Sequence, residues 1–474
     1  MLNRRSLLKA GTAAGVLAAV PAGLLGARPG RAAAAAAARA PFAVPLRIPR
    51  PQRALRMGGY DVYRLTTRES DVSIVPGATS RVRTFNGQLS PLIRAQRGRP
   101  VLIEQVNELP EPFSMHLHGG HVPHHSDGHP NNEVEPGGRR LFHYPNTQAG
   151  STMWVHDHSH DTHAENIYMG TAATYLLTDP EEDELPLPKG QYDVVLQMRD
   201  AKVEDDGTFV WDPNGFNDRP VFLVNGVPTP YFEVAARKYR LRLVNTSNER
   251  AFVLRLGEGD EFTHIATDGG LLPAPVPSRV LQLWPAERQE IVVDFSRYPV
   301  GSKVELQTMV TYPGETPEVM RFDVVREAED PSSVPEVLRP VEDLGTPTVE
   351  RMFEMSFSPE TGQHLINGKP FDVNRVDFRS RLGDVELWTI RNKDAEFGIP
   401  HSLHPHLAHF QVVDRNGQPP GPSEAGWKDT VTVRAGEEAR IKIQFTDYTG
   451  LFMFHCHLMG HLTMGMMGQM EMVR

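Results

Sequence analysis

The sequence predicts an all-β protein made of three consecutive domains of the sandwich or barrel type. Short stretches of alternating apolar and polar residues recur between turn clusters of Gly, Pro, Asn and Asp, for example at residues 239–245 and 438–445. This alternation is typical of strands that bury one face, and no long stretch has helical periodicity. The length of 474 residues corresponds to about three domains of ordinary size.

Three parts of the chain carry the same landmarks in the same order. Each has a predicted strand that ends in Asn, at residues 101–107, 239–245 and 385–392, and later a Gly before a second strand, at Gly150, Gly301 and Gly450. His116 and His401 each lie nine positions after the Asn of the first and third copies, whereas the middle copy has Leu254 there. The repeats therefore predict a middle domain that kept the fold without the functional residues.

Two acidic, proline-containing segments, residues 179–188 and 326–347, are expected to be solvated connections. They give predicted domains at residues 41–180, 189–328 and 348–474.

The first forty residues have the composition of an export signal. Arg4, Arg5 and Lys9 precede an apolar run at residues 10–26, which is too short and too rich in glycine for a transmembrane helix of roughly 20 strongly apolar residues. Residues 3–9 resemble a twin-arginine signal, and a general secretory signal is the alternative. We therefore expect an exported protein, periplasmic or extracellular, without a membrane span once residues 1–40 are removed.

The net charge argues against one class of partner, and the cysteine content argues against a disulfide. Residues 1–40 contain six Lys and Arg and no acid, so the net charge falls from −10 to about −16 without them. A protein this acidic is not expected to bind nucleic acid. Cys456 is the single cysteine and forms no internal disulfide, so it is either a buried inert thiol or a functional group.

Ten of the twenty histidines fall in four short motifs, two near each end of the chain. The motifs are His116-Leu117-His118, His156-Asp157-His158, His401-Ser402-Leu403-His404-Pro405-His406, and His455-Cys456-His457 followed by His461 and Met466. On a strand, residues i and i+2 share a face and lie roughly 6.5 to 7 Å apart, so paired histidines can serve neighbouring metal ions. One such pair is a weak signal, but four together predict a metal cluster.

The residue types around Cys456 favour copper. His401, Cys456, His461 and Met466 supply two imidazoles, a thiolate and a weak thioether, which is typical of a blue-copper site. Met467 is the alternative axial residue. Zinc also binds Cys and His, but it cannot change oxidation state, and a Cys-His link between two metal sites favours electron transfer.

These four motifs resemble the ligand signature of the multicopper oxidases over essentially the whole mature chain. Residues 158–170 and Val412-Val413 are most similar to the bacterial spore-coat laccase and bilirubin oxidase branch. The resemblance implies three cupredoxin-like Greek-key domains, four copper ions, and one-electron oxidation of a small-molecule reductant coupled to the four-electron reduction of O2 to water. It also implies a monomer, because all cluster ligands lie in one chain.

The resemblance assigns a role to each motif residue. A type 1 copper binds His401, Cys456 and His461, with Met466 axial. The type 2 copper binds His116 and His404, and the two type 3 coppers bind His118, His156 and His457, and His158, His406 and His455. Cys456, with His455 and His457, conducts electrons to the cluster.

Asp127 matches a carboxylate that this family places near the type 2 copper. We expect it to act as a proton relay or to orient its neighbours, and a plain turn at Asp127-Gly128 is the alternative. Leu462 stands where related bacterial enzymes often have a Glu that delivers protons, so Asp127 or another acid must take that role.

The remaining histidines and methionines are interpreted as structural. We expect an exposed polar loop at His121, His124, His125 and His129, and neighbours of ligands or surface residues at His160, His163 and His409. The methionines crowded near the C-terminus are expected to fill the core: Met453, Met459, Met464, Met466, Met467, Met470 and Met472.

Phenols and aromatic amines are the expected reductants. The alternatives are a Cu(I) or Mn(II) oxidase and a copper-free envelope scaffold protein.

Overall fold

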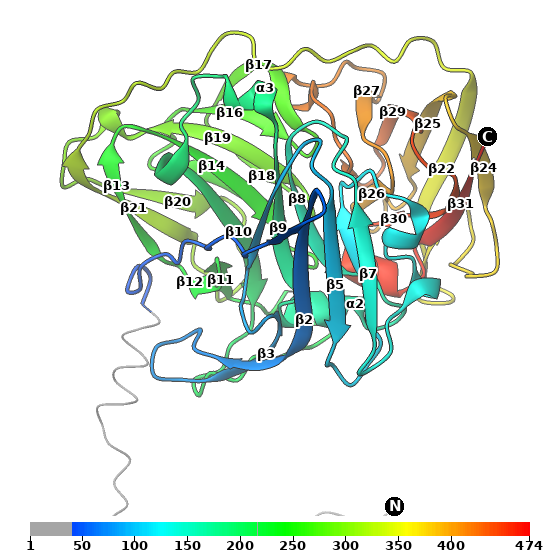
Figure 1. Cartoon of the computed structure of the whole chain (residues 1–474), viewed down its shortest axis with the longest axis horizontal. Coiled ribbons are helices and arrows are strands. Elements are labelled where there is room, and N and C mark those ends of the chain that lie inside the picture. Colours follow the sequence, from blue (N-terminus) through cyan, green and yellow to red (C-terminus); the bar gives the residue numbers. More distant parts are fainter. Residues whose placement is uncertain (1–39, 216) are drawn as a thin grey trace, which may run out of the picture.

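The computed structural model describes residues 40–215 and 217–474, and it confirms the all-β prediction. Residues 1–39 of the predicted export signal lie outside this part of the chain. The strands form three groups that follow one another along the sequence, and each group contains two sheets (Figure 1).

The first group lies between residues 55 and 178. One sheet has the order β1-β2-β5-β7, with β3 also paired to β2, and the other has the order β4-β9-β8-β6. The strands are β1 Leu55–Met57, β2 Tyr60–Val72, β3 Ser80–Phe85, β4 Leu92–Gln96, β5 Val101–Asn107, β6 Met115–His118, β7 Arg139–Tyr144, β8 Ser151–Asp157 and β9 Ala172–Thr178.

The middle group lies between residues 193 and 327. Its sheets have the orders β12-β11-β10-β14-β19-β16-β17 and β13-β21-β20-β15-β18. The strands are β10 Asp193–Ala201, β11 Val221–Val224, β12 Val227–Pro228, β13 Tyr231–Ala236, β14 Lys238–Asn245, β15 Phe252–Leu256, β16 Phe262–Thr267, β17 Gly270–Ser278, β18 Leu281–Leu283, β19 Arg288–Asp294, β20 Lys303–Thr308 and β21 Glu318–Glu327.

The third group lies between residues 349 and 473. Its sheets have the orders β23-β22-β25-β29-β27 and β24-β31-β30-β26-β28. The strands are β22 Val349–Ser358, β23 Gln363–Ile366, β24 Phe378–Arg381, β25 Val385–Asn392, β26 His401–Pro405, β27 Phe410–Arg415, β28 Val431–Val433, β29 Glu438–Gln444, β30 Gly450–Cys456 and β31 Met467–Val473.

Helices are short and lie between strands. Within the described ranges the α-helices are α2 His163–Met169, α3 Pro180–Asp183 and α4 Met459–Thr463, and the 3-10 helices are η1 His124–Ser126, η2 Pro130–Asn132, η3 Gly190–Tyr192, η4 Phe295–Arg297 and η5 Pro422–Glu424. None of these helices is long and apolar enough to cross a membrane.

The repeat seen in the sequence is a repeat of topology. In each group the first long strand runs parallel to the strand that ends in Asn, as β2 with β5, β10 with β14 and β22 with β25. Each of these Asn side chains donates from Nδ2 to two carbonyls and accepts an N–H from two residues onward, at Asn107, Asn245 and Asn392. The Asn therefore closes the turn after the strand, which explains why it recurs.

The connections between groups were expected to be solvated, and most of their residues are exposed or half-buried, but Leu187 and Leu338 are buried. The chain from β21 to β22 runs along one edge of the molecule, across the top of Figure 1. Leu187 and Leu338 from the two connections pack against Ile265 and Leu272 of the middle group. The two segments join the groups of strands, and their leucines supply apolar surface that the middle group buries.

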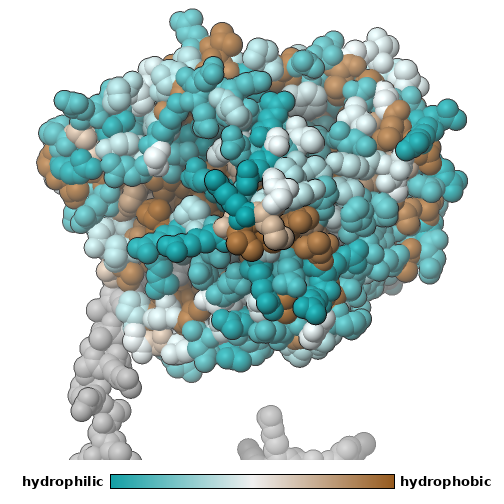
Figure 2. All heavy atoms as spheres, viewed as in Figure 1, coloured by the Kyte–Doolittle hydropathy of each residue, from teal (hydrophilic) through white to brown (hydrophobic). Residues whose placement is uncertain are grey.

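Each group has its own core between its two sheets. A further apolar cluster joins all three groups and includes Trp154, Val244 and Met453. The outer surface is largely hydrophilic, with apolar residues in small scattered areas on the face shown in Figure 2. The predicted functional residues lie next to the shared cluster, where the first and third groups meet.

Candidate functional site

Two pairs of antiparallel strands carry the predicted histidines. In the first group β6 pairs with β8, so that His116 lies opposite His156. In the third group β26 pairs with β30, so that His404 lies opposite His455. Alternation along β6 turns His116 and His118 to one face, and His404 and His406 share a face in the same way, as the motifs predicted. His401, three residues before His404, belongs to a different group.

The fold places these two strand pairs against each other. The rings of His116 and His406 stack with centroids 3.8 Å apart, and those of His118 and His404 stack at 3.7 Å. Three sets of side chains have ligand atoms within 4.8 Å of one another: His118, His156 and His457; His158, His406 and His455; and His116, His118 and His404. Residues more than 280 positions apart therefore form one cluster of eight imidazoles.

The cluster leaves ring nitrogens free on its inner side. Within the described residues the following buried nitrogens have no hydrogen-bond partner: His116 Nε2, His118 Nδ1, His156 Nε2, His404 Nε2 and both nitrogens of His457. In the other triad, His158 Nε2 and His406 Nε2 lie 3.1 and 3.3 Å from His455 Nε2. A buried polar atom without a partner costs about 1–3 kcal/mol. This number of unpaired ring nitrogens in one place therefore fits a site that binds metal ions.

The opposite nitrogen of several rings is held by an oxygen of the protein. His116 Nδ1 and His404 Nδ1 lie 2.6 and 2.7 Å from the carbonyl oxygens of Asp127 and Asp429. His156 and His455 each use Nδ1 toward the carbonyl of the following residue. An N–H that donates outward fixes the orientation of the ring and leaves the inner nitrogen as a lone pair for a metal.

Burial lowers the pKa of seven of the eight imidazoles, which favours their neutral form. All eight are at most 1% exposed. Burial and neighbouring imidazoles hold the pKa well below its usual range in six of them, His118, His156, His158, His404, His406 and His457. Burial also lowers the pKa of His455 to about 3. Neutral imidazole is the form that binds a metal.

Asp127 lies directly against the cluster. Its side chain is fully buried, and its Oδ2 accepts from His406 Nδ1 at 2.7 Å while its carbonyl accepts from His116. The following Gly128 has φ +84°, and a Cβ there would lie 2.5 Å from the Met115 carbonyl oxygen. The turn that was the alternative interpretation is therefore present, and it presses Asp127 against two cluster histidines.

A second group forms around Cys456, on the other face of β30. His401 Nδ1 lies 3.1 Å from His461 Nδ1, which lies 3.6 Å from Cys456 Sγ. Burial raises the pKa of the Cys456 thiol to about 12, so a thiolate here requires a bound cation. Met466 is fully buried in the same apolar cluster as Cys456, whereas Met467 packs in the cluster that joins the three groups.

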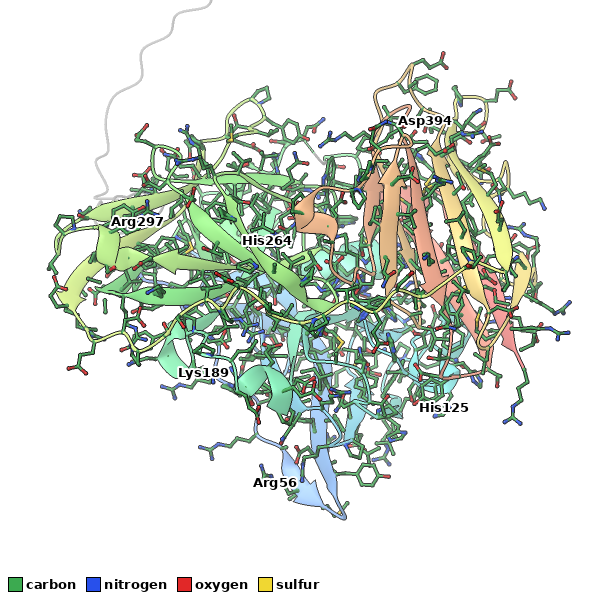
Figure 3. The ribbon with its side chains drawn as sticks, turned by 90° about the horizontal axis from the view of Figure 1, so that it is seen from above. Arg56, His125, Lys189, His264, Arg297 and Asp394 are labelled. Atoms are coloured by element: carbon green, nitrogen blue, oxygen red, sulfur yellow. The ribbon has the colours of Figure 1, made fainter. Side chains whose placement is uncertain are left out.

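Two residues beside this second group were missed in the sequence. Asp394 Oδ2 accepts from His401 Nε2 at 2.7 Å, and Figure 3 shows Asp394 in a loop at one end of the third group of strands. Asp394 lies two residues after the repeated Asn392, in the turn that this Asn closes, and this position in the sequence could have marked it as a candidate. His364 stacks on His461 with ring centroids 3.9 Å apart, and no motif marked it.

The middle group also reaches the cluster, which the sequence did not indicate. His118 Nε2 lies 2.9 Å from Asp429 Oδ1, and Arg288 on β19 donates from Nη1 to the same oxygen at 2.8 Å. Arg288 is fully buried and also donates from Nε to the Thr152 carbonyl on β8. Neither Asp429 nor Arg288 belongs to a recognisable motif.

The other histidines differ from the expected exposed loop at His121 and His129. The side chain of His121 is 21% exposed, and its Nδ1 lies 3.1 Å from Asp447 Oδ2. His124 and His125 are exposed. His129 is 3% exposed, and its Nε2 lies 2.8 Å from Gln469 Oε1, because β31 packs over this turn. His163 is buried beside the cluster, the side chain of His409 is 9% exposed, and that of His160 is about half exposed.

Comparison with known proteins identifies the family of this chain. Family models described as multicopper oxidase match residues 66–182 and 343–473. The laccase of Bacillus subtilis (strain 168) is 31% identical over 467 residues, with 83% of this chain and 90% of that protein covered. The bilirubin oxidase of Albifimbria verrucaria is 33% identical, with 89% and 79% covered.

Solved structures agree. A laccase from Pediococcus acidilactici superposes with a TM-score of 0.84 at 31% identity, with 91% of this chain and 94% of that chain covered. A multicopper oxidase from Campylobacter jejuni described as a metallo-oxidase has a TM-score of 0.80 at 25% identity. The relatives also include the cell division protein FtsP of Photorhabdus laumondii, at 30% identity. The chain therefore belongs to the multicopper oxidases, copper-dependent oxidoreductases with cupredoxin-type domains that use O2 as electron acceptor.

Proposed function

We propose that this chain is a laccase-like oxidase that takes single electrons from phenols or aromatic amines and delivers four of them to O2, which is reduced to water. One observation carries the proposal most directly. His455 and His457 turn into the histidine cluster, while Cys456 between them packs against His461 on the opposite face. The two groups are thus joined by single peptide units.

Four copper ions are assigned to these two groups. Copper supplies one-electron transfer at the thiolate group and the four-electron reduction of O2 at the cluster. The mononuclear ligands are His401, Cys456, His461 and Met466; the type 2 ligands are His116 and His404; and the type 3 ligands are His118, His156 and His457, and His158, His406 and His455. The free inner nitrogens and the two complete triads support this assignment.

The protein's own residues orient the ligands and handle protons. Asp127 Oδ2 holds the Nδ1 proton of His406, and Asp429 Oδ1 holds the Nε2 proton of His118. A cavity of about 220 Å³, lined by His158, Asp161 and Leu462, reaches the edge of the cluster and is a route for O2 and water. Because Leu462 carries no proton there, Asp127 is our candidate for proton relay.

The burial of the methionines supports aromatic reductants over Cu(I). Of the seven methionines near the C-terminus, which all lie in the described part of the chain, six are at most 6% exposed and only Met464 is open, at 41%. A cuprous site needs several accessible thioethers. The dense packing instead supports a role in the core around Cys456.

The test uses the mature protein loaded with copper. We expect four coppers per chain, an intense blue thiolate band, a near-ultraviolet shoulder from the coupled pair, and oxygen uptake with a phenolic donor without peroxide. Cys456→Ser is the matched control, because it keeps the volume and should lose only the blue band and turnover. Copper binding without a blue band in the unmutated protein would instead favour the scaffold function, and faster turnover with Cu(I) than with phenols would favour the metal-ion oxidase.

Organisation and export follow from the same proposal. We assign domains to residues 41–180, 189–328 and 348–474, supported by the fact that each pair of sheets falls inside one of these ranges. We also propose a monomer that is exported by the twin-arginine route. Size-exclusion chromatography with light scattering and Arg4→Lys/Arg5→Lys export assays test these two points.

A further inference from the structure

A third imidazole lies beside the proposed mononuclear copper ligands. The ring of His364, on β23, covers the ring of His461 at an interplanar angle of 14°, with centroids 3.9 Å apart. It meets the His401 ring edge-on, with centroids 5.6 Å apart. Ligand atoms of all three histidines lie within 4.8 Å of one another, so His364 is close enough to affect the metal.

The stacked geometry argues against His364 as a ligand of the same ion. The lone pair of an imidazole nitrogen lies in the plane of the ring, and metal–nitrogen bonds are about 2 Å long. Two nearly parallel rings that overlap direct their lone pairs along separate planes, which do not converge on one ion. The histidine cluster supports this reasoning, because its stacked pairs, His116–His406 and His118–His404, join residues assigned to different ions.

We propose that His364 is a positioning residue of the mononuclear centre, which packs on His461, excludes water from that face and keeps the reduction potential of the copper high. The inference rests on the proposed function, since it concerns the copper assigned to His401, Cys456 and His461. It adds a residue to the centre that does not bind the metal.

The surroundings of His364 fit this role. The side chain is 3% exposed, and its Nδ1 is buried without a hydrogen-bond partner in the described structure. Phe357, opposite His364 in the β22–β23 pair, packs on it with ring centroids 4.9 Å apart. The Phe357 N–H also donates to Asp394, which in turn accepts from His401. One pair of strands thus supports both histidine ligands.

The direction of the effect follows from charge. The oxidised copper site carries one more positive charge than the reduced site, so water beside it stabilises the oxidised form and lowers the reduction potential. Removing the His364 ring opens the face of His461 to water. A ring without nitrogens at this position should keep the cover.

The experiment compares copper-loaded His364→Ala and His364→Phe with the unmutated protein by redox titration of the blue band and by electron paramagnetic resonance. His125→Ala, which removes an exposed imidazole, is the matched control. We expect His364→Ala to keep the blue band and to lower the equilibrium constant for copper reduction by roughly tenfold, which is about 59 mV for one electron. His364→Phe and His125→Ala should stay within about twofold of the unmutated protein.

Two results would overturn the inference while leaving the proposed function intact. In the first, His364→Ala titrates like the unmutated protein. In the second, both His364 variants lose the blue band or change the copper hyperfine splitting, which would make His364 a ligand. If His364→Ala fails to fold, His364→Ser, which also removes the ring and admits water, must show a fall in the equilibrium constant. Absence of a blue band in the unmutated protein would instead contradict the proposed function itself.

Discussion

Arg288→Met tests whether the middle group of strands supports the histidine cluster. The Arg288 guanidinium bridges three parts of the chain, because it donates to Asp429, to the Thr152 carbonyl and to the Asp268 carbonyl. Asp429 in turn holds the ring of His118. Both charged groups are at most 1% exposed, so water cannot replace either partner.

The structure sets the expected size of the effect. Loss of one partner of a buried ion pair leaves an unpaired charge and costs about 3–5 kcal/mol. Burial alone raises the pKa of the Asp429 carboxyl and Arg288 lowers it, with the net result well below the usual range. Without Arg288 the carboxyl becomes far easier to protonate and holds His118 less firmly. At 1.36 kcal/mol per tenfold, we expect copper in the cluster to be bound at least about 100-fold more weakly.

The assay is a chelator titration of the copper-loaded protein that follows the near-ultraviolet shoulder and the blue band separately. Arg288→Met should lose the shoulder at lower chelator concentration and keep the blue band. Arg297→Met is the control, since Arg297 is exposed at the far edge of the middle group (Figure 3). The double variant Arg288→Met/Asp429→Asn should regain part of the loss, because it leaves no unpaired charge. Equal chelator sensitivity of Arg288→Met and the unmutated protein would refute the reasoning.

Three further predictions follow from the site. Asp127→Asn keeps an acceptor for His406 but not the charge, so oxygen uptake should fall about 10–100-fold with the blue band unchanged, and an unaltered rate would contradict a role in proton transfer. Gly128→Ala places a Cβ against the Met115 carbonyl at positive φ, so denaturant titration should show a free energy of unfolding lower by more than about 1 kcal/mol. Gly137→Ala, which also has positive φ but no atom nearby, should lower the free energy of unfolding by less. Removal of copper leaves the buried inner nitrogens without partners, so calorimetry should show a lower unfolding temperature, which added copper restores. Equal unfolding temperatures with and without copper would contradict metal binding at the histidine cluster.

Local chemistry made much of the site predictable. A strand turns every second residue to the same face. The motifs His116-Leu117-His118 and His455-Cys456-His457 therefore predict two histidines on one face and the middle residue on the other, without knowledge of the fold. The recurring Asn107, Asn245 and Asn392 were equally readable, because each closes the turn next to it. The prediction of solvated connections was wrong at Leu187 and Leu338, where a distant sheet decides burial.

The sequence by itself determined the all-β class, the three repeated units, the residue types of the proposed ligands and their alternation along strands, because each depends on residues a few positions apart. Only the tertiary structure decided how the distant histidines are brought together, since His158 and His455 are 297 positions apart and meet through packing between groups of strands. It also revealed the supporting residues Arg288, Asp394 and His364. Arg288 and His364 act through contacts with residues far away in the chain, and such contacts leave no periodicity or spacing in the sequence.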